Sequence, residues 1–142
     1  MNKKVCMTVL GVLISTNLFA GTLKVGASPV PHAELLNYLK KDLKKEGVDL
    51  KVIEFTDFVT PNEALISGEL DANYFQHLPH LKLIVQKEKS ADLIDAAKVH
   101  VETIGLYSKK YKSLKAIKDG AKIAIPSDST NEGRALILLH NN

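Results

Sequence analysis

The fold follows from two strand-like segments, Thr22-Leu-Lys-Val-Gly-Ala27 and Asp49-Leu-Lys-Val-Ile-Glu-Phe55. Both contain the alternating, β-branched and apolar residues that favour strands. Residues 32–46 place leucines on one helical face and lysines on the other, and Gly47 follows as a C-terminal cap. A strand, a helix and a second strand within about 35 residues form a βαβ unit, so we expect a parallel sheet.

Strand-like and helix-like segments alternate through the rest of the chain. A helix is expected to start at Thr60, with Thr60 as its cap, Pro61 in the first turn and Glu63 completing a capping box. This helix should stop at Gly68. We predict further strands at residues 70–75, 99–106 and 122–125, and further helices at residues 77–88, 114–117 and 132–140. The alternation predicts an α/β fold.

The predicted elements divide the chain into four parts. These are a signal peptide at residues 1–20, a first α/β lobe at 21–107, a crossover or hinge region at 108–117, and the beginning of a second α/β lobe at 118–142. A strand–loop–helix unit starting at Lys122 needs a partner strand to complete its crossover. No sequence follows Asn142 to supply that strand, so we expect an incomplete second lobe.

The first twenty residues have the pattern of a secretory signal. Lys3 and Lys4 form the positive region, and a mostly apolar run ends in Ala20. A membrane anchor is the alternative, but this run is shorter than the ~20 apolar residues of a spanning helix. The single cysteine, Cys6, lies inside the leader, and no lipid-attachment cysteine follows the apolar run. We expect an exported protein of the periplasm or cell envelope, for which a lipid anchor is doubtful.

The charge of the chain argues against a nucleic-acid partner. The formal net charge is +3, but without Lys3 and Lys4 only 17 basic residues face 16 acidic ones. A nucleic-acid-binding domain needs a strongly basic face. Arg134 is the only arginine among the 19 basic residues. It is a candidate for carboxylate recognition, because its planar fork grips carboxylates where lysine offers a point charge.

Residues 71–80, Asp-Ala-Asn-Tyr-Phe-Gln-His-Leu-Pro-His, crowd aromatic, imidazole and amide side chains together. Such a mixture is typical of a small-molecule pocket. In an extended segment Phe75 and His77 point the same way, at the strand end where open α/β sheets bind ligands. Phe58 follows the second strand and reaches the same edge. The alternatives are that Phe75 is core, that His77 caps a helix and that Phe58 packs on the following helix.

A metal site is the alternative interpretation of His77 and His80. They are three residues apart, and a third ligand would have to come from His32, His100 or a carboxylate. A pair of histidines lacks the closed ligand set that zinc requires. We therefore favour the small-molecule pocket and expect no metal and no cofactor.

The loop at residues 126–131 follows a predicted strand and opens a predicted helix. Free backbone N–H groups at such a start bind anions, and Ser129, Thr130 or Asn131 is expected to cap the helix. Arg134 follows within the first helical turn. An arginine beside a helix N-terminus is suited to hold a carboxylate. The alternative is that Arg134 is an ordinary solvated helix residue.

No residue pattern indicates catalysis. The sequence has no Gly-rich phosphate loop, no cysteine after the leader and no Gly-x-Ser-x-Gly elbow. We therefore expect a binding protein rather than an enzyme.

Several blocks, in order, resemble the NlpA-type family of methionine-binding lipoproteins. They are Leu23-Lys-Val-Gly-Ala-Ser-Pro-Val-Pro-His-Ala-Glu-Leu-Leu36, Glu54-Phe-Thr-Asp-Phe58, Asn62-Glu-Ala-Leu65, Asp71-Ala-Asn-Tyr-Phe-Gln-His77, Gly105-Leu-Tyr-Ser-Lys109, Ile123-Ala-Ile-Pro126 and Asn131-Glu-Gly-Arg-Ala-Leu136. The resemblance runs from Leu23 to the last residue and matches only the N-terminal part of family members.

The resemblance implies a type II periplasmic-binding-protein-like fold, with two α/β lobes around a ligand cleft. Such proteins deliver L- or D-methionine, or a related small amino acid or peptide, to an ABC importer, and they are not enzymes. It also implies a set of ligand-binding residues: Phe58, Tyr74, Phe75, His77, Asn131 and Arg134. Aromatic rings suit a polarizable thioether, and arginine suits the ligand carboxylate.

The sequence departs from the family pattern in two ways. Family members usually carry a lipidated cysteine at the mature start, and they are far longer than this chain of 142 residues. Closure around a ligand needs two complete lobes. We therefore expect this polypeptide alone to bind methionine weakly or not at all.

Overall fold

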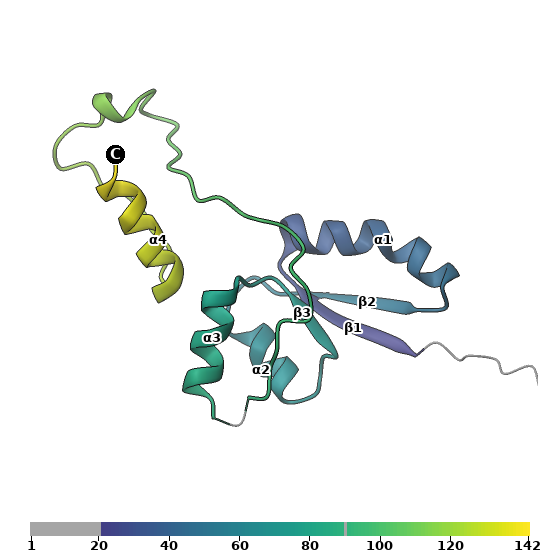
Figure 1. The fold of residues 1–142 in the computed structure, drawn as a ribbon. Coiled ribbons are helices and arrows are strands. Elements are labelled where there is room, and N and C mark those ends of the chain that lie inside the picture. Colours follow the sequence, from purple (N-terminus) through teal and green to yellow (C-terminus); the bar gives the residue numbers. More distant parts are fainter. Residues whose placement is uncertain (1–20, 90) are drawn as a thin grey trace, which may run out of the picture.

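The computed structural model describes residues 21–89 and 91–142, so the expected signal peptide lies outside the described residues. A three-stranded parallel sheet forms its centre, with the strand order β2-β1-β3 (Figure 1). The strands are β1 (Thr22–Ala27), β2 (Asp49–Glu54) and β3 (Ala72–Tyr74). The predicted βαβ unit and parallel sheet are therefore confirmed.

Four α-helices accompany the sheet in the described part of the chain. They are α1 (Glu34–Lys45), α2 (Thr60–Ile66), α3 (Leu78–Lys87) and α4 (Ser129–His140), with one-turn elements η1 (Pro29–Ala33) and η2 (Leu114–Ala116). Gly47 and Gly68 follow α1 and α2 with positive φ angles of 85° and 80°. Glycine adopts this conformation without steric cost, which explains why both helices end there.

The core forms where β1 meets the elements on either side of it. Val25 and Ala27 of β1 are buried together with Leu50 of β2, and Leu70 and Phe75 close the core around β3. Gly26 lies in the middle of β1, where an added Cβ would come within 2.6 Å of Leu70 Cδ1. The strand therefore needs glycine at this position, because its neighbours pack directly against the backbone.

Two predicted helix caps are wrong. At α2 the N-cap position is Val59 rather than Thr60, and the Asp57 carboxylate accepts hydrogen bonds from the Val59 N–H and the Thr60 N–H just ahead of the helix, both at 2.8 Å. The Thr60 hydroxyl donates to the same carboxylate instead of accepting. At α4 the cap is Asp128, which accepts from the Asn131 N–H at 2.9 Å. A carboxylate satisfies several free helix donors at once, so it replaces the neighbouring hydroxyls.

The strands predicted at residues 99–106 and 122–125 are also wrong. Both segments are apolar enough to form strands, but a strand needs a neighbour whose main chain completes the ladder. Residues 92–112 make no backbone–backbone hydrogen bond to another described residue, and β3 pairs only with β1 among the described strands. The helix predicted at residues 132–140 is confirmed, although it begins earlier, at Ser129.

In the described part of the chain after α3, no further strand joins the sheet. Figure 1 shows the segment after α3 running as an extended connection toward α4, which lies apart from the three strands. None of the helices within residues 21–89 and 91–142 is both long enough and apolar enough to cross a membrane.

Candidate functional site

Two aromatic rings meet at the carboxyl edge of the sheet. Phe58 lies in the loop after β2, and Phe75 directly follows β3. Their rings stack with centroids 6.2 Å apart and an interplanar angle of 18°. Phe75 is buried, while Phe58 is 44% exposed. Phe75 therefore serves the core as well as this edge, and Phe58 presents an apolar ring to whatever approaches the carboxyl ends of the strands.

The stacked rings of Phe58 and Phe75 are called the aromatic wall below. His77 follows Phe75 by two residues, and one of its buried polar atoms has no partner among the described residues. Its Nε2 atom is buried and makes no hydrogen bond to any described residue. Its side chain makes no capping hydrogen bond to α3, which begins at the next residue. Its ring stacks on His80 with centroids 6.3 Å apart. Buried polar atoms are almost always satisfied, so an unpaired one marks a place for a ligand or a water molecule.

The surroundings of His77 keep its imidazole neutral. Burial is the largest effect and lowers its pKa below the ordinary value of 6.5, and the positive charges of Arg134 and His80 lower it further. The carboxylates of Asp128 and Glu102 act in the opposite direction but do not compensate. Burial also lowers the pKa of His80. A neutral His77 offers one donor and one acceptor nitrogen.

Four polar side chains form a hydrogen-bonded network beside Phe75 and His77. They are Asn62, Asn73, Gln76 and His80. The Asn62 side chain, only 2% exposed, exchanges two hydrogen bonds with Gln76, at 3.1 and 2.8 Å. Asn73 donates to Asn62 Oδ1 at 3.0 Å, and His80 Nδ1 lies 3.1 Å from Gln76 Oε1. The sequence analysis grouped the amides of residues 71–80 but did not include Asn62, which lies 14 residues before Gln76 in a helix that also contains Thr60 and Glu63 and so gives no local signal of this contact.

Arg134 and Asn131 come from the first turns of α4. Arg134 Nη1 donates to Asn131 Oδ1 at 2.9 Å, and Arg134 Nη2 donates to the backbone oxygen of Glu102 at 2.8 Å. The guanidinium is therefore held by its own helix and by the segment between α3 and α4, which is called the connecting segment. These two bonds leave several of its N–H donors for another acceptor. The free N–H groups expected at this helix start are partly used, because Asp128 already accepts from Asn131.

Hydrogen bonding makes Asp128 a stable anion at the start of α4. Burial by itself would raise its pKa, but hydrogen bonds from the Asn131 N–H, the Thr130 hydroxyl and the Asn131 amide lower the pKa below its ordinary value. The Asp128 carboxylate acts on both His77 and His80 and favours their charged forms. The negative charge at the start of α4 therefore acts on His77 and His80.

Tyr74 lies apart from the Phe58–Phe75 wall, because neighbouring strand residues point to opposite faces. Its hydroxyl lies 2.6 Å from His100 Nδ1, and its ring packs edge-on against His32 with centroids 4.6 Å apart. His100 Nε2 lies 2.9 Å from Glu102 Oε1. Of the six predicted site residues, the structure thus groups Phe58 with Phe75, links His77 electrostatically to Arg134, and places Tyr74 in a second cluster.

The interpretation of His77 and His80 as a metal site is not supported. Their rings are stacked, and His80 Nδ1 is engaged with Gln76. Within the described residues, the group whose ligand atoms lie close enough to hold a metal is His32, His100 and Glu102. That group involves neither His77 nor His80.

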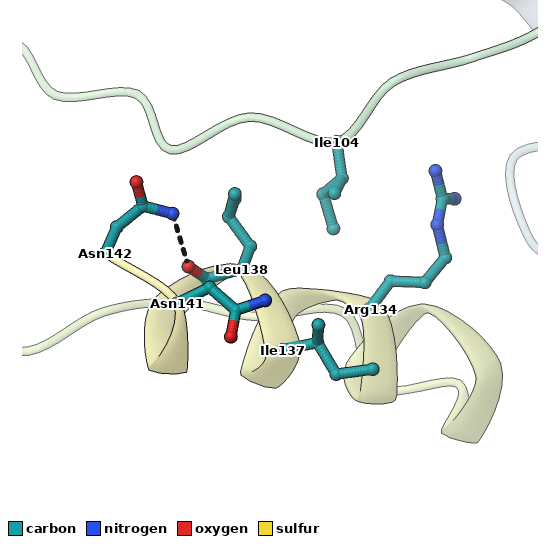
Figure 2. Close-up of a pocket in the computed structure, with 6 residues that line it drawn as sticks. All are labelled: Ile104, Arg134, Ile137, Leu138, Asn141 and Asn142. Carbon is teal, nitrogen blue, oxygen red and sulfur yellow. Dashed lines mark hydrogen bonds between the residues drawn. The ribbon is translucent and has the colours of Figure 1, made fainter.

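An open cavity of about 320 Å³ lies between α4 and the connecting segment (Figure 2). It is lined by Ile104, Arg134, Ile137, Leu138, Asn141 and Asn142. In Figure 2 the Ile104 side chain points toward α4, and the Arg134 side chain extends from the helix toward the segment that carries Ile104. Arg134 is the only predicted site residue in this lining, so the cavity is distinct from the Phe58–Phe75 wall.

Comparisons with known proteins identify the family of the chain. Residues 23–142 match the family described as NlpA lipoprotein. The chain is 43% identical over 130 residues to "Membrane lipoprotein TpN32" of Treponema pallidum, covering 92% of this chain and 48% of that protein. It is 43% identical over 117 residues to "Methionine-binding lipoprotein MetQ" of Bacillus subtilis, covering 82% of this chain and 43% of that protein.

A solved structure shares the fold. It is the structure of a nutrient binding protein from Burkholderia cenocepacia bound to methionine, at 48% sequence identity and a TM-score of 0.78, covering 84% of this chain and 49% of that one. The chain spans about half the length of the relatives that it matches. The α/β fold of the periplasmic-binding-protein type is confirmed by this similarity and by the parallel sheet. The chain belongs to the NlpA lipoprotein family.

Proposed function

We propose that this chain carries one wall of a binding site for methionine, or for a related small amino acid or peptide, in an extracytoplasmic substrate-binding protein of an ABC importer. The observation that carries the proposal is the unpaired, buried His77 Nε2 beside the stacked Phe58 and Phe75 rings, with Arg134 close enough to lower the His77 pKa. The names of the relatives support the ligand, since they include a methionine-binding lipoprotein and a protein bound to methionine.

Each residue has a distinct role in this proposal. Phe58 and Phe75 contact the thioether, because aromatic rings interact favourably with polarizable sulfur. Arg134 pairs with the carboxylate through its remaining N–H donors, and Asn131 orients the guanidinium. Neutral His77 supplies a hydrogen bond to a polar group of the ligand. Tyr74 belongs to the proposed site although it lies in the neighbouring cluster. Its hydroxyl positions His100 there.

The same proposal covers the organisation of the whole protein. The first lobe comprises residues 21–107, residues 108–117 cross over, and residues 118–142 begin a second lobe that brings Arg134 to the ligand. The protein binds its ligand without transforming it, and it acts outside the cytoplasm after export. Its partners are the permease and ATPase of the importer.

Saturation-transfer NMR on the full chain tests the proposed ligand. Because the chain spans about half the length of its relatives, we expect weak binding, seen as saturation transfer to the methyl group of L-methionine at millimolar concentration. Phe75→Ala and Arg134→Ala should each reduce the signal about fivefold or more, because they remove the thioether and carboxylate contacts. D-Methionine and leucine, measured in competition, define the specificity.

Ile137→Ala is the matched control, because Ile137 lines the cavity of Figure 2 but not the aromatic wall. It should leave the methionine signal unchanged. Absence of any methionine signal, or a signal that Ile137→Ala removes while Phe75→Ala does not, would overturn the proposal. Calorimetric binding in the micromolar range would contradict the expected weakness but not the site.

A further inference from the structure

Three potential metal ligands converge beside β1, outside the proposed methionine wall. His32 lies in η1, whereas His100 and Glu102 lie in the connection between α3 and α4. Glu102 Oε1 lies 2.9 Å from His100 Nε2 and 3.5 Å from His32 Nε2. The three ligand atoms all lie within 4.8 Å of one another. Residues distant in sequence thus direct two imidazole nitrogens toward one carboxylate oxygen.

Both imidazoles are oriented by a hydroxyl group on the opposite ring nitrogen. Ser28 Oγ lies 2.6 Å from His32 Nδ1, and Tyr74 Oη lies 2.6 Å from His100 Nδ1. The His32 and Tyr74 rings also pack edge-on, which restricts their rotation. Metal-binding histidines characteristically use the second nitrogen in such a contact, which fixes the ring and its tautomer.

The spacing suits a small divalent cation. Zinc binds histidine nitrogen and carboxylate oxygen at about 2.0–2.2 Å, so tetrahedral ligand atoms lie roughly 3.3 Å apart. The two distances to Glu102 Oε1 bracket this value, and the third, between the two imidazole nitrogens, is at most 4.8 Å. We propose that His32, His100 and Glu102 form a three-ligand site for a divalent transition-metal ion such as Zn²⁺, with a fourth position open to water.

The neighbouring hydroxyls allow the site to load without unpaired atoms. In this structure His100 Nε2 lies 2.9 Å and His32 Nε2 lies 3.5 Å from Glu102 Oε1, and the Ser28 and Tyr74 hydroxyls lie at the Nδ1 atoms. On metal binding each Nε2 must be free of its proton, so the Nδ1 atom carries the proton and donates to the hydroxyl oxygen. Hydroxyl groups both donate and accept hydrogen bonds. The carboxylate supplies one negative charge, and Glu102 is half-exposed, which leaves a route for the ion.

The predicted consequence is mechanical. His32 belongs to the first part of the fold, and Glu102 belongs to the connection that its own backbone oxygen ties to Arg134. A bound ion would fix the connecting segment to η1, which follows β1. Because Arg134 donates to the Glu102 backbone oxygen, the ion would also restrict the guanidinium that the proposed ligand uses. The metal site does not depend on the identity of that ligand.

Zinc titration of the untagged full chain tests the site. We expect one Zn²⁺ per chain by isothermal titration calorimetry, with perturbed ¹⁵N signals of the His32 and His100 rings. Glu102→Gln and His100→Ala should each weaken binding at least about tenfold. Tyr74→Phe, which removes a hydroxyl but no ligand, should weaken it by about tenfold. Glu102→Gln and Tyr74→Phe are nearly isosteric, so they test the proposal even if His100→Ala fails to fold.

His140→Ala is the matched control, because His140 ends α4 outside this cluster. It should bind Zn²⁺ like the wild type. No stoichiometric binding, equal affinity in Glu102→Gln and wild type, or a loss that occurs in His77→Gln rather than in His100→Ala would overturn the proposal. Methionine titrations of the same samples, with and without Zn²⁺, separate failure of the metal site from failure of the ligand site.

Discussion

Asp128 holds the start of α4 with one carboxylate. Oδ1 accepts from the Asn131 N–H and the Thr130 hydroxyl, and Oδ2 accepts from the Asn131 side chain. Asp128→Ala should therefore destabilise this helix by about 1 kcal/mol. Amide hydrogen exchange in the first turn of α4 should accelerate about fivefold. Asp128→Asn retains a good capping residue and should restore most of the protection; equal exchange in wild type and Asp128→Ala would contradict the assigned cap.

The Asn62 side chain makes hydrogen bonds to two polar side chains, those of Gln76 and Asn73. Asn62→Ala would remove its hydrogen bonds to Gln76 and Asn73, whose half-buried amides would keep only their bonds to each other, to the Pro61 backbone oxygen and to His80. An intramolecular hydrogen bond contributes about 1 kcal/mol, and Asn62 makes three with these two side chains, so the free energy of unfolding should fall by about 3 kcal/mol. Urea denaturation followed by circular dichroism measures this loss. Glu63→Ala, at the exposed next position of α2, should change stability little; a similar loss in both variants would argue against a role for the network.

At the scale of the strand, Gly26 sets how closely β1 packs. An added Cβ would lie 2.6 Å from Leu70 Cδ1 and 3.0 Å from Phe55 Cε2. Gly26→Ala should therefore force these side chains apart and lower the free energy of unfolding by about 2 kcal/mol. Gly21→Ala is the control, since its added Cβ would meet no described atom within 4 Å apart from those of its chain neighbours. If both variants unfold at the same urea concentration as the wild type, the tight packing of β1 is refuted.

At the scale of the whole molecule, neutral histidines make stability depend on pH. The pKa of His77 and of His80 is lowered from 6.5, mainly by burial. Below about pH 6.5 the unfolded chain takes up protons that the folded protein still excludes. The free energy of unfolding should therefore fall as the pH drops from about 7.5 to about 5.

Urea denaturation at a series of pH values in metal-free buffer measures this dependence. The His77→Gln variant lacks one of the two groups, so its free energy of unfolding should fall less steeply over the same range. An identical slope in the wild type and in His77→Gln would show that His77 is not held neutral by the fold. Besides burial, the groups that act on the pKa of these two histidines are Arg134, Asp128, Glu102 and Lys87, together with His80 acting on His77.

Local signals predicted most of the first half of the molecule. The alternation of residues 22–27 and 49–55 predicted two paired strands, and both formed in parallel register. Residues 99–106 and 122–125 carry a similar local pattern, but in the described structure neither forms a strand. The two cases differ in the partner strand that is available. β2 pairs with β1, whereas the later segments have no described strand with which to pair. Periodicity is local, but a strand is a property of two segments.

The sequence by itself determined the βαβ unit and the ends of α1 and α2, and it predicted Phe58, Phe75, His77 and Arg134 as candidate site residues. Each of these can be predicted from residues within a few positions of one another, or from several sequence blocks that resemble the family in the same order. Only the tertiary structure decided that Tyr74 lies with His100, 26 residues away, and that Arg134 holds the backbone of Glu102, 32 residues away. No local pattern encodes such pairs, because their distance is set by the packing of whole elements. The packing therefore separated the aromatic wall from the cluster of His32, His100 and Glu102.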